Sequence, residues 1–415
     1  MTGRCPLSSI SAVAESAKAS NDPVRYPTDR LSPFDPPPVL SQIAVDFGPI
    51  CRLIYPDGHV GWLVTGADVA RDILSDDRFS ACSELKRAPV LRPGAEPFIG
   101  KPALPGWFVD MDRPEHTRIR RTVSERLSLR SIRKMTPRIE AIVNLQLDLI
   151  ANRDTPVDLI DAFALPVPTL VICELLGVPY ERHTEFQKAS RSLFSLTASA
   201  AEAIDAMQQL EGLIRDILEI KRHSGADDLL GQMANDHNLS DDEAVGLSVL
   251  LLTAGHETVA GTIGLSAFFA MQRPDVRKVF TSEPESIVGV VEEILRYLTI
   301  FHFGVPRTAL EQIVIGDHLI KVGDTVTVAL PAVNRDPASF REPHLFDPQR
   351  SPNKHLAFGF GIHQCSGQHL ARLELQIALA KLFQRFPTLR LTVTEREVPL
   401  SRAGFLGVET LPVTW

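Results

Sequence analysis

Cys365 lies in a glycine-rich stretch, residues 357–372, whose composition suits a site for a flat ligand or a metal. The stretch begins as a loop and continues into apolar residues at helical spacing, so Cys365 is expected at or just before a helix N-terminus. The unpaired N–H groups and the positive dipole end found there stabilise a thiolate, the metal-ligating form. Gly359, Gly361 and Gly367 permit positive φ and close approach of a ligand to the sulfur. A buried structural cysteine is the alternative interpretation.

A second chemical signal lies inside a long apolar segment. Ser240 and Glu243 form a capping-box pattern, and apolar residues then continue on nearly every side over Val245–Gln272, which predicts a buried helix. Its centre reads Ala254-Gly255-His256-Glu257-Thr258. A glycine and two titratable side chains destabilise a buried helix, and sequences break such rules mainly at functional sites. A tolerated kink is the structural alternative.

Two shorter charge patterns follow helical spacing. In residues 112–121, His116 and Arg120 are four apart and share one helix face, which by itself is typical of a solvated basic helix. Glu293 and Arg296 are three apart and can pair, although an exposed pair contributes little stability.

The pattern Phe358-x-x-Gly361-x-His363-x-Cys365-x-Gly367 resembles the haem-binding loop of the cytochrome P450 family, in which the cysteine thiolate is the proximal iron ligand. Residues 112–121, 254–258 and 293–296 resemble three further motifs of that family, in its order and spacing. The resemblance therefore covers nearly the whole chain. The residue after the cysteine is usually a bulky aliphatic but is Ser366 here, so the hydrogen bonding and redox potential at the sulfur can differ.

The resemblance implies that haem b (iron protoporphyrin IX) is bound through Cys365. His116, Arg120 and Arg307 would be donors to its propionates, a geometry that arginine serves well. The other cofactor-binding residues implied by the resemblance are Ala254, Gly255, Phe358, Gly359, His363 and Gly367. Arg118 and Arg121 point elsewhere and could meet a negatively charged redox partner.

The family's acid–alcohol pair would be Glu257 and Thr258. Thr258 would donate a hydrogen bond to the oxygen being activated, and Glu257 would help deliver protons from solvent. Gly255 would let oxygen and substrate approach. Glu293 and Arg296 would be buried, joined by Arg350, and would hold the segment leading to the cysteine loop without a catalytic role.

The fold class implied is mainly α: the cytochrome P450 fold as a single domain over residues 1–415, with a smaller β-sheet region. Proline-rich residues 1–38 would form an extended, partly mobile arm on the surface. The pattern predicts a hairpin over residues 51–64, strands over 301–330 with turns at Gly316 and Gly323, and a small terminal sheet. The proline-rich loop 82–106 would cover the substrate, and two helices over residues 183–223 would roof the pocket.

The resemblance implies a monooxygenase that inserts one oxygen atom from O2 into an apolar small molecule, by hydroxylation or epoxidation. Electrons would come from a separate ferredoxin and its reductase, and the haem would carry the chemistry. Phe301, Phe303 and Phe405 indicate an apolar substrate but do not identify it.

Two alternatives use the same cofactor differently. A haem-thiolate nitric oxide reductase would take hydride directly from a nicotinamide, and residues 108–116 and 408–415 resemble such enzymes. Those enzymes lack the carboxylate of the acid–alcohol pair, so Glu257 argues against this function. A non-enzymatic haem sensor would have little use for Glu257 and Thr258 and would need a signalling output.

Composition excludes several other classes. A net charge of −8 and a pI near 5.9 argue against a nucleic-acid partner. Five cysteines are far apart without a C-x-x-C motif, which suits a reducing cytoplasm and excludes a zinc ribbon. The first residues lack the apolar core of a signal peptide, and no stretch is expected to reach the length of a membrane span. We therefore expect a cytoplasmic protein without a membrane partner.

Overall fold

The computed structural model describes residues 22–401 and 403–415. The helices of this part are α2 (Pro38–Phe47), α3 (Ala67–Ser75), α4 (Glu115–Ser124), α5 (Leu129–Lys134), α6 (Thr136–Ala151), α7 (Pro166–Leu176), α8 (His183–Phe194), α9 (Ala200–Ser224), α10 (Leu229–Ala234), α11 (Asp241–Gln272), α12 (Pro274–Ser282), α13 (Ile287–Leu298), α14 (Leu330–Val333) and α15 (Gln368–Arg385). The strands are β1 (Ile50–Ile54), β2 (Val60–Val64), β3 (Phe79–Ser80), β4 (Val157–Asp158), β5 (Val305–Ala309), β6 (Ile313–Ile315), β7 (His318–Ile320), β8 (Thr325–Val328), β9 (Arg390–Leu391) and β10 (Pro412–Thr414).

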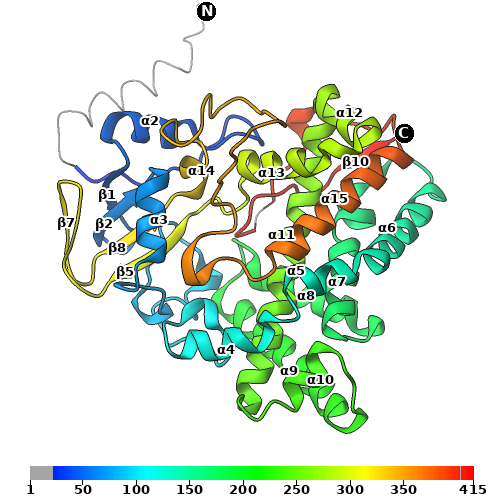
Figure 1. Cartoon of the computed structure of the whole chain (residues 1–415), viewed down its shortest axis with the longest axis horizontal. Helices are drawn as coiled ribbons and strands as arrows, with labels where there is room; N and C mark the ends of the chain where they lie inside the picture. Colours follow the sequence, from blue (N-terminus) through cyan, green and yellow to red (C-terminus); the bar gives the residue numbers. More distant parts are fainter. Residues whose placement is uncertain (1–21, 402) are drawn as a thin grey trace, which may run out of the picture.

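Helix α11 crosses the middle of the molecule, with α15 beside it (Figure 1). The predicted capping box is present: the Ser240 side chain accepts from the Glu243 N–H, and the Glu243 carboxylate accepts from the Ser240 N–H. Most of the helix is buried against α7, α9 and α15. A helix enclosed on all sides must be apolar on all sides.

The expectation that no stretch reaches the length of a membrane span is wrong for α11. Among the described helices, it alone has the length and apolar composition that could cross a membrane. Within the fold, 67% of its most apolar window is buried, because the helix forms the centre of the protein core. A central core helix and a membrane span share these features of composition.

The larger sheet lies beside the helical body and has the strand order β1-β2-β8-β5-β3 (Figure 1). The predicted hairpin pairs Cys51 with Leu63 in an antiparallel register. The strands predicted over residues 301–330 are also present, with turns at Gly316 and Gly323. The terminal sheet contains β9 and β10 as predicted and gains β4 from the middle of the chain.

The described part of the N-terminal arm is packed against the fold, so the expectation of a surface arm does not hold there. Val24 forms a bridge with Leu53 of β1. The Phe34 ring contacts those of Phe268 and Phe269 on α11, with centroids 4.8 and 5.1 Å apart. The apolar Phe34 side chain therefore anchors a segment that proline content alone marks only as extended. Residues 1–21 lie outside the described residues.

The covering loop, residues 82–106, contains only short 3₁₀ turns, as its prolines and glycines predict. Its end interlocks with the first turns of α11. A Cβ atom added to Gly106 would lie 2.3 Å from the Glu243 carbonyl oxygen, and one added to Gly246 would lie 1.9 Å from the Pro105 carbonyl oxygen. Backbone therefore meets backbone at this crossing, which only glycine permits at the two positions.

Candidate functional site

The cysteine loop folds back on itself just before α15. The Cys365 N–H donates to the Phe358 carbonyl oxygen at 2.8 Å, which closes the loop. Gly359 and Gly361 have φ of 70° and 72°, as the sequence predicts. A Cβ atom at Gly361 would lie 2.2 Å from the Leu74 carbonyl oxygen, so the loop packs tightly on α3. Gly367 differs from the prediction: it is the N-cap of α15 with φ of −83°.

The Cys365 side chain is accessible to solvent, but it lies deep in the protein, with protein atoms around it. Burial raises the pKa of its thiol, while the N–H groups of Gly367 and Gln368 and the Arg120 guanidinium lower it. The predicted contribution of the helix N-terminus is thus present but is smaller than the effect of burial. A metal cation bound at the sulfur reverses this balance, because coordination deprotonates a thiol.

A cluster of basic side chains lies beside the loop. The rings of His116 and His363 are 4.4 Å apart, and all four ring nitrogens are buried without hydrogen-bond partners. Burial lowers the pKa of His116 to about 4 and that of His363 to about 2. Arg120 donates to the carbonyl oxygens of Ile362 and Gln364. Arg307 is 5% exposed and donates only to the adjacent Pro306 carbonyl oxygen.

These residues fit the propionate end of a haem. Within the described chain, no carboxylate hydrogen-bonds to His116, Arg120, Arg307 or His363. Buried donors are normally paired. The charges of Asp110 and Asp112 lie close to Arg307 without hydrogen-bonding to it, and two carboxylates of a ligand would supply the missing acceptors. The described residues contain no group of three His, Cys, Asp or Glu side chains able to hold a bare metal ion.

The middle of α11 contributes the opposite side of the site. Ala254 is exposed at the centre of this otherwise buried helix, so it borders an internal space. The Thr258 hydroxyl donates to the Ala254 carbonyl oxygen at 2.7 Å. The single hydroxyl hydrogen is therefore used within the helix, and the Thr258 oxygen is available as an acceptor rather than as the donor that the sequence predicts.

Glu257 is a buried carboxyl without a hydrogen-bond partner at Oε1. Burial raises its pKa to about 7, against a smaller lowering by Arg191. His256 Nδ1 lies 3.5 Å from this oxygen, and burial lowers the pKa of that fully buried histidine to about 3. Glu257 therefore exchanges its proton near neutral pH, beside a neutral imidazole.

Gly255 has a packing reason that the sequence did not indicate. A Cβ atom at this position would lie 2.8 Å from Cδ1 of Ile172 on α7. The glycine thus allows α11 and α7 to approach closely. In this structure the exposed position of the motif is Ala254.

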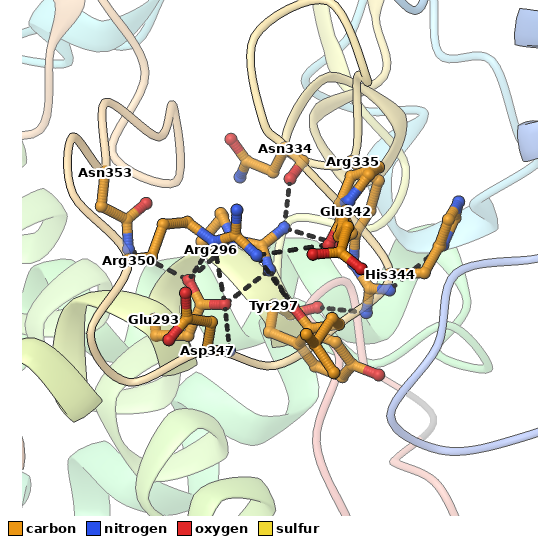
Figure 2. Close-up of polar contacts among 12 residues, drawn as sticks. Glu293, Arg296, Tyr297, Asn334, Arg335, Glu342, His344, Asp347, Arg350 and Asn353 are labelled. Atoms are coloured by element: carbon orange, nitrogen blue, oxygen red, sulfur yellow. Dashed lines mark hydrogen bonds and ion pairs between the residues drawn. The ribbon is translucent and has the colours of Figure 1, made fainter.

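Glu293 and Arg296 of α13 form a buried ion pair (Figure 2). Both side chains are 0% exposed, and Glu293 Oε1 lies 2.7 Å from Arg296 Nη2 and 3.2 Å from Arg350 Nε. The predicted burial and the predicted second arginine are both confirmed. Arg296 also donates to the carbonyl oxygens of Asn334, Pro343 and Leu345. The pair therefore holds the meander that leads to the cysteine loop.

The sequence interpretation missed a second acid in the same motif. Glu292 accepts hydrogen bonds from His355 and Arg372, which lie before and after the cysteine. Burial raises the pKa of Glu292, but these bonds outweigh it and hold the pKa at about 2. Side chains of adjacent residues on a helix point in different directions. The Glu292-Glu293 dipeptide in the sequence therefore indicated that the two acids would have different partners.

Three phenylalanines form the aromatic wall, the name used here for Phe194, Phe301 and Phe405. The Phe405 ring lies 5.3 Å from that of Phe194 and 5.0 Å from that of Phe301. The 400–408 hairpin that carries Phe405 packs on α11 at Gly261, one turn after Thr258. Phe303, expected in the same pocket, packs instead with the β1–β2 core cluster.

Comparison with known proteins agrees with this geometry. A model of the cytochrome P450 family matches residues 178–410. Cytochrome P450-SU2 of Streptomyces griseolus is 38% identical over 400 residues, covering 96% of this chain and 98% of the relative. The 20-oxo-5-O-mycaminosyltylactone 23-monooxygenase of Streptomyces fradiae is 36% identical, covering 94% and 92%. The crystal structure of the mycinamicin VIII C21 methyl hydroxylase of Micromonospora griseorubida, bound to mycinamicin VIII, is similar with a TM-score of 0.87 and 32% identity, covering 94% of this chain and 100% of that chain.

The chain therefore belongs to the cytochrome P450 family and has the bacterial-type fold of that family. Within the family it is a monooxygenase, an oxidoreductase that uses a haem-thiolate cofactor, O2 and a redox partner. The predicted family, fold class and enzyme class are confirmed.

Proposed function

We propose that Cys365 is the thiolate ligand of haem b, and that His116, Arg120, Arg307 and His363 face its propionates. The observation that carries this proposal is a solvent-accessible cysteine beside basic side chains that hydrogen-bond to no carboxylate of the described residues. Phe358, Gly359 and Gly367 shape the loop that brings the sulfur to the cofactor, and Ala254 and Gly255 border it on α11.

The reaction we propose is insertion of one oxygen atom from O2 into an apolar small molecule, by hydroxylation or epoxidation. When bound, the haem supplies the reductive activation of O2. Two of the relatives named above, one for a tylactone and one crystallised with mycinamicin VIII, support a small-molecule substrate. The aromatic wall would orient an apolar substrate and exclude water.

The protein's own chemical contribution is the placement of protons. Glu257 gains and loses a proton near neutral pH, so it can pass one toward the substrate side of α11. Thr258, whose hydrogen is donated to Ala254, can accept a hydrogen bond from dioxygen as it gains protons. In this proposal Glu257 supplies protons, and Thr258 positions the oxygen that receives them.

A ferredoxin-type protein is the electron donor that the surface charge supports. Four exposed cations that form no ion pair within the described residues run from the end of α4 through α5, which packs on α15: Arg121, Arg130, Arg133 and Lys134. Burial lowers the pKa of His369, four residues after the cysteine, and the charges of Arg372 and Arg133 lower it further, so the patch reaches the thiolate side. Arg118, expected in this surface, is paired with Glu243 instead.

We place the protein in the cytoplasm because its thiols are free. Cys51, Cys82, Cys173 and Cys365, the cysteines within the described residues, form no disulfide. Free and widely spaced cysteines are typical of a reducing compartment.

The function is tested by stoichiometry. We expect purified holoenzyme, with NADPH, ferredoxin reductase and ferredoxin, to consume O2 and yield oxygenated product once a binding compound is found. Omission of ferredoxin should stop turnover. Nicotinamide oxidation in the presence of nitric oxide, with no partner protein added, would contradict the proposal and establish the reductive alternative.

Thr258→Ala is expected to uncouple the reaction. Substrate binding and electron uptake should remain nearly intact. Most of the O2 consumed should appear as hydrogen peroxide, because the Thr258 hydroxyl no longer holds the reduced oxygen in place by a hydrogen bond. Glu257→Gln is the matched variant: it should slow turnover more than it uncouples it, because proton supply is impaired. The measurement is the ratio of peroxide to product, and tight coupling in Thr258→Ala would contradict the role given to Thr258.

Arg120→Ala and Arg307→Ala are expected to weaken haem retention. Each removes a charge-assisted hydrogen bond to a propionate, at a cost of about 1.5–3 kcal/mol. Haem transfer to an acceptor protein should be faster in each variant and fastest in the double variant. Arg121→Ala is the control, since Arg121 is exposed on the same helix. Unchanged transfer rates would show that the two arginines do not face the propionates.

A further inference from the structure

Arg92 of the covering loop is a largely buried cation without a partner. Its Nε is buried with no hydrogen bond, and the guanidinium makes no ion pair with the described residues. Burial alone lowers its pKa, so no carboxylate lies close enough to stabilise its charge. An uncompensated buried charge is costly, and proteins retain one mainly where a ligand supplies the counter-charge.

The other basic side chains nearby are paired. A surface cavity of about 610 Å³ between the loop and the larger sheet is lined by Lys86, Arg87 and Arg92 and by the acids Asp57, Glu84 and Glu96, none of which forms an ion pair with Arg92. Lys86 lies 2.6 Å from Asp110, and Arg87 lies 2.9 Å from Asp57. Lys86 and Arg87 therefore form ion pairs within the described residues and Arg92 does not. A ligand could reach the Arg92 guanidinium from solvent through the cavity.

Arg92 lies at the end of the aromatic wall. A Cβ atom added to Gly404 would lie 2.8 Å from Arg92 Nη2, so the guanidinium rests on the backbone of the 400–408 hairpin. The next residue is Phe405, whose ring contacts Phe301 and Phe194. Of two consecutive residues, Gly404 therefore contacts the Arg92 guanidinium and Phe405 belongs to the aromatic wall.

Two more basic groups meet the same place. His302 follows Phe301 and its Nε2 is buried without a partner; burial, with a smaller contribution from the charges of Arg30 and Arg92, lowers its pKa to about 3. Arg30 has Nε and Nη2 buried without partners, while its Nη1 donates to the Asp35 carbonyl oxygen. This group is separate from the propionate cluster, because His363 is affected by Arg307, His116, Lys86 and Arg120 but not by Arg92 or Arg30.

We propose that Arg92, supported by Arg30 and His302, binds a carboxylate of the substrate at the edge of the aromatic wall. The inference rests on the proposed function and narrows its substrate class to amphipathic carboxylic acids, oxidised at an apolar carbon away from the acid. The planar guanidinium suits a carboxylate because it can donate two parallel hydrogen bonds.

The test compares acids with the matching alcohols. Dissociation constants are measured by calorimetry on the holoenzyme at pH 8 for decanoic acid and decan-1-ol, and for 4-phenylbutanoic acid and 4-phenylbutan-1-ol. We expect the acid of at least one pair to bind about tenfold or more tightly than its alcohol. Arg92→Gln should reduce this preference to within about twofold, as expected for loss of a charge-assisted bond. Arg87→Gln, in the same loop but paired with Asp57, should retain it.

Three results would overturn the proposal: no preference for the acid in either pair, a preference retained in Arg92→Gln, or an equal loss in Arg87→Gln. Thermal stability supplies a second measurement. Removing an uncompensated buried cation should leave the melting temperature of Arg92→Gln equal to or above that of the wild type. A lower melting temperature would show a structural role and would also overturn the proposal. The CO spectrum of the reduced protein tests the proposed function independently of these results.

Discussion

Cys365→Ser is expected to abolish the spectroscopic signature and the activity together. The reduced wild-type protein with CO should show the strongly red-shifted Soret band of a thiolate–iron–CO complex, because the soft sulfur donates charge to the iron. A serine oxygen cannot supply this donation. The variant should therefore lack the band, and substrate oxidation should fall to background.

The matched control is Cys82→Ser. Cys82 lies close to the basic cluster through its contact with Asp112, with Sγ 3.3 Å from Oδ2, and it is only partly buried. This variant should keep the band. A band that survives in Cys365→Ser would mean that another sulfur ligates the iron, and the proposed ligation would be wrong.

Arg296→Leu is expected to be the most destabilising substitution outside the cofactor site. It leaves the Glu293 carboxylate buried and deprived of its closest partner, which costs about 3–5 kcal/mol. It also leaves the carbonyl oxygens of Asn334 and Pro343 without the donor that they share. The urea midpoint, followed in parallel by circular dichroism and by haem absorbance, should fall in both signals.

Arg341→Leu provides the control for this experiment. Arg341 is 93% exposed and lies 3.8 Å from Glu342, so its pair is worth about 0–1 kcal/mol. The double substitution of Glu293→Gln with Arg296→Met should be less harmful than Arg296→Leu, because the buried Glu293 carboxylate is removed together with its closest partner. Arg350 loses its acid in this variant but keeps its hydrogen bonds to backbone carbonyl oxygens. A midpoint for Arg296→Leu equal to that of Arg341→Leu would show that the buried pair does not hold the meander.

The sequence predicted those features that depend on local spacing. Ser240 and Glu243 are three residues apart because a capping box needs that spacing, and the helix begins there. Glu293 and Arg296 pair because residues three apart share a helix face. Gly361 adopts positive φ because its loop must pass against α3. Each of these geometries is set within a few residues.

Features that depend on distant partners could not be read in this way. Glu243 was predicted as a helix cap, but nothing near it in sequence indicates that it also accepts from Arg118, 125 residues away. The packing of Gly255 depends on Ile172 of another helix. Arg92 forms no ion pair with the described residues, although Glu84 and Glu96 line the same cavity, and only the tertiary structure reveals this.

The interlock of Gly106 and Gly246 limits how the pocket can open. Because backbone contacts backbone on both sides of this crossing, residues 105–106 cannot slide along α11 unless the two segments first separate. Residues 105–106 therefore form a fixed end of the covering loop. A larger residue at position 106 or 246 would separate this end of the loop from α11.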